Sequence, residues 1–77
     1  MDGAKLVRMA NQIAGFFAVD PDRAAAVAAI AGHLQRFWEP RMRREILAVL
    51  DRGGEHGLHE LVEAALREHR PQLQPAG

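Results

Sequence analysis

Residues 20–40 read DPDRAAAVAAIAGHLQRFWEP and contain both the start and the end of one helix. Asp20 is a residue type that caps helices, and Pro21 fits the first helical position, where a missing N–H costs nothing. The alanines that follow favour helix strongly. Glu39 is disfavoured as a helical residue because Pro40 follows it. We therefore predict a helix between Asp20 and Pro40, with a narrow alanine surface that another helix can approach closely.

Prolines and glycines divide the rest of the chain in the same way, into three further helical segments. Helical spacing of apolar residues predicts helices over residues 4–18, 40–52 and 58–69, with Asp2 as the N-cap of the first. Glycines after residue 52 end the helix of residues 40–52, because glycine accepts the left-handed conformation of a C-cap. No segment alternates apolar and polar residues as a strand does. The fold class that we predict is all-α, a small bundle of three to four short helices.

We expect a single helical domain over residues 1–70 and a flexible, disordered C-terminal tail over residues 71–77. The apolar stripes of the helices are expected to meet in one small core. Its predicted members are Met9, Ile13, Phe17, Ile30, Leu34, Ile46, Leu50, Leu61 and Val62. A chain of this length buries barely enough apolar surface to offset the entropy of ordering, so a partner chain is expected to complete the structure.

The composition argues against several classes of protein. Ten basic and ten acidic side chains give no net charge, which is unlike a protein that binds nucleic acid or an anionic membrane. The chain has no cysteine, serine, threonine or tyrosine, so it lacks a nucleophile for covalent catalysis and thiolates for a metal cluster. The longest apolar run, Ala24–Ala31, is too short to span a bilayer, and no secretory leader opens the chain. We expect a cytoplasmic protein that is not an enzyme by itself.

The histidines raise the hypothesis of a metal site. His59 and Glu63 are four residues apart on one helical face, with His56 nearby, but a third ligand would have to come from a glycine-rich loop. We interpret these histidines as surface residues and expect no bound metal. His33 lies one turn before Phe37 and is interpreted as a packing or hydrogen-bonding residue.

The most unusual stretch is residues 37–44, FWEPRMRR, which we call the elbow. Residues 36–44 contain four basic side chains and one acidic, a balance of +3, whereas residues 45–68 contain two basic and six acidic, a balance of −4. Tryptophan, methionine and arginine are enriched at the cores of protein interfaces. The elbow therefore has two readings: a docking surface for a larger partner, or Phe37 and Trp38 filling the chain's own core beside solvated arginines.

Several strings carry a resemblance to a known family. They are MANQIA at residues 9–14 with Phe16-Phe17, His33-Leu34, FWEPRMR at residues 37–43, Leu50-Asp51 with Gly53-Gly54, and Gly57-Leu58 with Leu61-Val62. Over residues 5–66 the chain resembles the delta subunit of bacterial NAD-dependent formate dehydrogenase. One departure is the EHGLHE sequence of residues 55–60, where relatives often have a proline, which leaves the start of the fourth helix open.

The resemblance implies an accessory subunit of a soluble complex that oxidises formate and reduces NAD. It implies that the alpha subunit carries a molybdenum or tungsten bis-pyranopterin and iron–sulfur clusters, and that other subunits carry FMN and further clusters. No cofactor is then expected on this chain, and the catalytic (alpha) subunit is the expected partner, with other subunits as further contacts. The partner-binding residues that we predict are Asn11, His33, Phe37, Trp38, Pro40, Arg41, Met42 and Arg43.

Within this set, Trp38 and Met42 would supply buried apolar area, while Arg41 and Arg43 would pair with carboxylates or carbonyls of the partner. Asn11 has two readings, an ordinary surface residue or a hydrogen-bonding contact to a partner backbone. Two alternative functions stay open. One is a transient assembly chaperone that binds the apo catalytic subunit or its pterin cofactor, and the other is a self-associating helical module that forms a homodimer when isolated.

Overall fold

The computed structural model describes residues 2–76 and contains only helices and their connections in that range. The helices are α1 Gly3–Phe17, α2 Arg23–Phe37, α3 Pro40–Arg52, α4 Glu60–Glu68 and the short α5 Arg70–Leu73. The predicted all-α class is confirmed, and α3 has the predicted bounds. Across residues 2–76, no helix combines the length and the apolar character needed to cross a membrane.

The ends of α1 and α3 follow the predicted signals. The Asp2 carboxylate accepts a hydrogen bond from the backbone N–H of Ala4 at 3.0 Å and caps α1. Pro40 occupies the first turn of α3, where its missing N–H is not needed. Gly53 ends α3 with a φ of +70°, a conformation that other residues adopt only under strain.

The start of α2 differs from the prediction. Asp22, and not Asp20, is the N-cap, because its carboxylate accepts the backbone N–H of Ala25 at 3.3 Å. Asp20 instead accepts the N–H of Asp22 at 2.9 Å and so holds the turn before the helix. Asp20 therefore stabilises the turn, Asp22 caps the helix, and α2 begins at Arg23.

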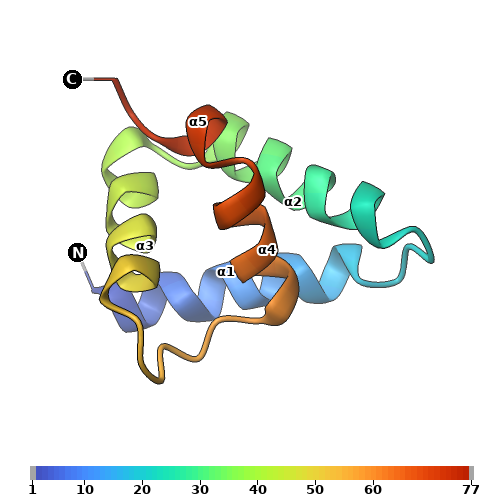
Figure 1. Ribbon diagram of the computed structural model, residues 1–77, viewed down its shortest axis with the longest axis horizontal. Coiled ribbons are helices and arrows are strands. Elements are labelled where there is room, and N and C mark those ends of the chain that lie inside the picture. The colour runs from blue at the N-terminus through green and yellow to red at the C-terminus, as the bar shows by residue number, and fades with distance from the viewer. Residues whose placement is uncertain (1, 77) are drawn as a thin grey trace.

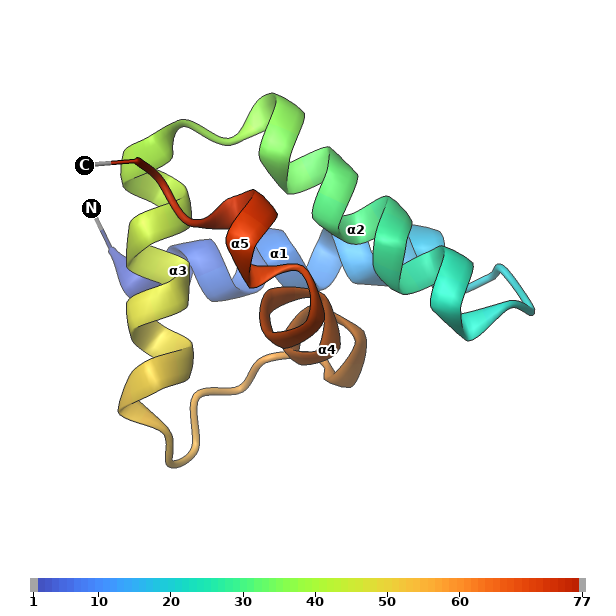
Figure 2. The same cartoon turned by 45° about the horizontal axis from the view of Figure 1, so that its top comes forward.

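Helices α1, α2 and α3 form an open triangular frame (Figure 1). α1 runs along one side, α2 returns from the end of α1 at an angle to it, and α3 leads from the end of α2 back towards the beginning of α1. α4 and α5 lie over one face of this frame, and α4 packs against all three of its helices (Figure 2). Within residues 2–76, no helix covers the opposite face of the frame.

The core lies between the frame and α4. The largest fully buried side chains are Ile30, Leu34, Ile46, Leu66, Leu73, Val27 and Val62. The core residues predicted on α2, α3 and α4 are all buried, namely Ile30, Leu34, Ile46, Leu50, Leu61 and Val62. Their apolar spacing therefore predicted the packed face of these three helices correctly.

The core prediction for α1 is wrong about which face is central. Met9, Ile13 and Phe17 are only partly buried and pack at the edge of the core. The residues that α1 buries completely or nearly so are Leu6, Val7, Ala10 and Ala14. Two of these are alanines, whose small side chains let the neighbouring helices approach α1 closely. The inward face of α1 is therefore lined by small side chains as well as large ones.

Asn11 fixes the loop between α3 and α4 against α1. Its amide nitrogen donates to the carbonyl oxygen of Gly57 at 2.9 Å, and its oxygen accepts the backbone N–H of His59 at 2.8 Å. The Nδ1 of His59 then accepts the N–H of Leu61 at 3.0 Å and caps α4. α4 consequently begins at Glu60, two residues later than predicted.

The chain beyond residue 70 differs from the expected flexible tail. Arg70–Leu73 form α5, and the side chain of Leu73 is completely buried. Arg70 donates hydrogen bonds to both carboxylate oxygens of Asp51 on α3, at 2.8 and 2.7 Å. One apolar side chain and one bidentate ion pair therefore hold this segment against the frame.

Candidate partner-binding site

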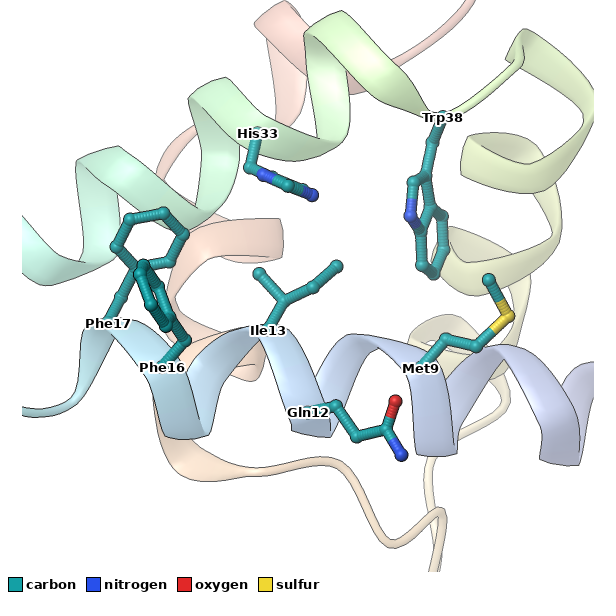
Figure 3. A pocket seen from close by; sticks show the side chains of 7 residues that line it. All are labelled: Met9, Gln12, Ile13, Phe16, Phe17, His33 and Trp38. Atoms are coloured by element: carbon teal, nitrogen blue, oxygen red, sulfur yellow. The ribbon is translucent and has the colours of Figure 1, made fainter.

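An apolar groove opens on the face of the frame that α4 and α5 leave uncovered (Figure 3). It lies between α1 and α2 and has a volume of about 440 Å³. Its lining residues are Met9, Gln12, Ile13, Phe16, Phe17, His33 and Trp38. In Figure 3 α4 lies behind these side chains, so the groove and α4 occupy opposite faces of the frame.

A row of aromatic rings connects the end of α1 to the end of α2. The Phe16 and Phe17 rings meet edge to face with centroids 5.1 Å apart. The Phe17 and His33 rings are 6.1 Å apart, and the His33 and Phe37 rings are 4.8 Å apart. Contacts of this kind stabilise the positions of the rings. The row therefore gives the groove a preformed aromatic border.

Two members of this row are exposed to solvent. Phe16 is 74% exposed and Phe37 is 69% exposed, although both belong to residue types that usually lie inside proteins. Trp38, which follows Phe37 directly, is only 6% exposed and contributes one wall of the groove. A contiguous apolar surface that the chain's own core does not cover is typical of a protein interaction site.

Four arginines in or directly before the elbow are unpaired in the part of the chain that the structure describes, and one of them, Arg36, lies beside the Phe37 ring. Arg36, Arg41, Arg43 and Arg44 form no ion pair with any residue from 2 to 76, and the paired arginines of this range all lie outside residues 36–44. The Arg36 guanidinium lies 6.0 Å from the centre of the Phe37 ring. The Nε of Arg43 is buried without a hydrogen-bond partner in the described chain. These groups can bind carboxylates of another molecule, because guanidinium pairs with carboxylate in a bidentate geometry.

The structure brings most of the predicted partner-binding residues into one region. Three of them lie at the groove or its border: His33, Phe37 and Trp38. Four others belong to the elbow and form the first turn of α3: Pro40, Arg41, Met42 and Arg43. Of these four, Pro40 and Arg41 are exposed, and Met42 and Arg43 are half-buried. The predicted residue that lies apart is Asn11, whose polar atoms bind the chain's own α3–α4 loop.

The α1 side of the groove was not predicted as a binding surface. Met9, Ile13 and Phe16 follow one another at intervals of four and three residues, so they share a helical face. This face lies next to the one that α1 buries in the core, which makes α1 apolar over much of its circumference. A surface helix needs only one apolar stripe for its own core. The second stripe is the sequence signal that could have identified the groove.

The histidines of the α3–α4 loop have contacts that account for them structurally. The Nδ1 of His56 accepts the N–H of Leu58 at 3.1 Å, and its Nε2 lies 3.7 Å from a carboxylate oxygen of Glu63. Within the described part of the chain, no three histidine, aspartate or glutamate side chains are grouped closely enough to hold a metal ion. The arrangement as a whole is suited to bind an apolar surface bordered by acidic groups.

Comparison with known proteins identifies one family. The sequence model of the NADH-dependent formate dehydrogenase delta subunit, FdsD, matches residues 5–66. This range contains the groove and the elbow, and it confirms the resemblance seen in the sequence. No curated protein and no solved structure matches the chain significantly.

Proposed function

Because the chain belongs to the family of NADH-dependent formate dehydrogenase delta subunits, we propose that it binds and stabilises the catalytic subunit of a cytoplasmic formate dehydrogenase. Its contact surface is the docking face, which we define as the groove between α1 and α2 together with Arg36, Phe37 and the first turn of α3. The observation that carries the proposal is the exposure of Phe16 and Phe37, with the unpaired Arg36 beside the Phe37 ring, a combination of anchor types that is enriched at interfaces.

The proposed mechanism is stabilisation by mass action. A subunit that binds only the native catalytic subunit raises the free energy of unfolding of that subunit, by about 2.7 kcal/mol at a free concentration of 100 times Kd. The exposed phenylalanines supply apolar area that leaves water on binding. The arginines supply hydrogen-bond donors for carboxylates at the rim of the interface, which fix orientation and accelerate association.

In this proposal the redox groups of the complex belong to its other subunits. The chain contains no cysteine to ligate an iron–sulfur cluster. The described residues also contain no cluster of side chains that fits a metal ion. The contribution of this chain to formate oxidation is therefore made through the stability of its partner, and we place no step of the reaction on its residues.

A second candidate function is a transient assembly chaperone. The unpaired Arg41, Arg43 and Arg44 favour it, because guanidinium groups also bind the phosphates of a pterin dinucleotide. The two candidates differ in what accompanies the chain in the cell. A subunit stays with the loaded enzyme, whereas a chaperone leaves when the cofactor has been inserted.

The test is purification of the tagged chain from its native host at moderate salt, followed by mass spectrometry and by metal and pterin analysis. We expect the catalytic subunit at a fixed ratio, with its molybdenum or tungsten present. The same partner without metal and pterin would favour the chaperone instead. Recovery of the chain alone, as a monomer or a homodimer, would contradict both candidates.

A further inference from the structure

The two faces of α1 suggest that the frame is built to hold a helix on each side. One face of α1 packs in the core with α4 behind it, and Leu6 and Ala10 lie on this face. The other face presents Met9, Ile13 and Phe16 to the groove at i, i+4 and i+7. This is the spacing at which a helix packs against another helix. The chain's own core covers Met9 and Ile13 only in part, and no helix of residues 2–76 lies across the groove.

The volume of the groove fits the anchoring side chains of such a helix. The groove measures about 440 Å³. An apolar cavity of about 150 Å³ accommodates one benzene ring, so the groove has room for two or three large apolar side chains. A helix that lies in a groove inserts about this number, from positions i, i+3 or i+4, and i+7. The row of rings from Phe16 to Phe37 forms one border for these anchors.

The chain's own α4 shows what kind of helix this frame holds on its other face. α4 is amphipathic, and it buries Leu61, Val62 and Ala65 against the frame. Its outer face is acidic, and Glu60 pairs with Arg23 of α2 at 3.2 Å. An arginine at the beginning of α2 thus forms an ion pair with the acidic outer face of α4.

Two exposed arginines at and beside the elbow have no carboxylate partner among residues 2–76. Arg36 lies at the end of α2, beside Phe37, and Arg41 lies in the first turn of α3. Both are exposed, and neither pairs with a carboxylate among residues 2–76. Arg36 lies next to the Phe37 ring, which borders the groove through His33, and an exposed cation in this position favours a partner that carries carboxylates beside its apolar side chains.

We propose that the docking face binds an acidic amphipathic helix of the catalytic subunit, laid across α1 and α2 on the side opposite α4. The apolar side chains of this helix enter the groove over Ile13, and its carboxylates meet Arg36 and Arg41. The inference rests on the proposed function, since it assigns the helix to that partner. It goes further by stating the secondary structure, the charge and the position of the segment that binds.

Site-specific photo-crosslinking in the complex tests this assignment. Gln12 is exposed and lines the groove, and Gln12→p-benzoylphenylalanine places a photoreactive group there without removing a core residue. The matched control is Glu68→p-benzoylphenylalanine, which is exposed on α4, groups with Arg23 and Glu60 and does not line the groove. Each variant is co-expressed with the catalytic subunit, irradiated, and analysed by mass spectrometry of the crosslinked peptides.

We expect position 12 to crosslink to one segment of the catalytic subunit that has helical apolar spacing and an excess of Asp and Glu. Position 68 should not crosslink to that segment. A crosslink from position 12 to a second copy of this chain would overturn the proposal, as would one to a basic or non-helical segment. If the complex forms but position 12 gives no crosslink, the helix proposal fails and the proposed function stands. If no complex forms, both fail.

Charge reversal provides an independent measurement. Arg36→Glu combined with Arg41→Glu should weaken binding to the catalytic subunit by roughly two- to tenfold, since each exposed ion pair contributes little. Arg52→Glu is the matched control, because Arg52 is exposed, unpaired among residues 2–76 and distant from the groove at the end of α3. The control should leave binding within twofold of the wild type. Equal effects of the two changes would contradict an acidic helix at the docking face.

Discussion

Phe37 and Trp38 are neighbours in the sequence with opposite environments. Phe37 is the last residue of α2, and Trp38 follows in an extended conformation with φ −91° and ψ 132°. The change of backbone direction turns one ring outwards and the other into the core, so that they are 69% and 6% exposed. The two interpretations of the elbow, a core filler and a docking surface, therefore apply to different residues. Trp38 fills the chain's own core, and Phe37 remains available to a partner.

This division predicts different effects of two alanine substitutions. Trp38→Ala should lower the free energy of unfolding by about 3–5 kcal/mol, because it removes a large, nearly fully buried side chain and leaves a cavity. Phe37→Ala should change it by less than about 0.5 kcal/mol, because the ring is exposed. Urea unfolding of the isolated chain, followed by circular dichroism, measures both. Equal losses for the two variants would contradict the placement of Trp38.

Asn11 and Gln12 form a second pair of neighbours with a testable difference. Asn11 holds the α3–α4 loop through two hydrogen bonds, whereas Gln12 is exposed at the groove. Asn11→Ala leaves a backbone carbonyl and a backbone N–H without these partners and should cost about 1–3 kcal/mol in unfolding free energy. Gln12→Ala is the control and should cost less than about 0.5 kcal/mol. Similar costs for both would show that Asn11 does not hold the loop.

At the scale of elements, the contact between α3 and α5 gives a prediction about pH. The hydrogen bonds from Arg70, with the charge of its guanidinium, hold the pKa of the Asp51 carboxyl below its ordinary value. A carboxyl whose pKa is lower in the folded state stabilises the fold above its unfolded pKa of about 3.9 and loses this effect as the pH falls through the folded value. The pair is exposed, so the effect is small.

We therefore expect Asp51→Asn to lower the Tm at pH 7 by a small amount and to lose this difference as the pH falls below about 4. Glu68→Gln is the control, because Glu68 is exposed and forms no ion pair with residues 2–76. Its Tm should follow that of the wild type at every pH. Thermal unfolding of the three proteins across this pH range gives the comparison. A difference for Asp51→Asn that persists in acid would contradict the ion pair.

The sequence predicted those elements whose signals are local. Pro40 and Gly53 mark the ends of α3, and the apolar spacing of α2 to α4 identifies the buried residues of these helices. The sequence did not predict features whose structure depends on distant parts of the chain. Leu73 is a single apolar residue after a proline, and only its contact with the core gives α5 a stable position. The α1 side of the groove was missed for the same reason, since periodicity does not tell which of two adjacent apolar stripes the core uses.

At the scale of the whole molecule, the frame has one closed face and one open face. The closed face is covered by α4 and α5, and the ion pair of Arg23 with Glu60 satisfies part of its charge (Figure 2). The open face carries the groove, with the exposed Phe16 and Phe37 at its border. This asymmetry agrees with a small chain that completes its structure on a larger partner. The family of formate dehydrogenase delta subunits is the context in which we propose such a partner.

The most direct test of the docking face is the affinity of the chain for the catalytic subunit after its exposed rings are removed. Phe16→Ser combined with Phe37→Ser should weaken binding by roughly 30-fold or more, because exposed aromatic side chains that a partner buries are among the strongest anchors of an interface. Val19→Ser is the control, since Val19 is 84% exposed and does not line the groove. Biolayer interferometry at fixed salt should show less than a twofold change for this control. Wild-type affinity in the double variant would contradict the account.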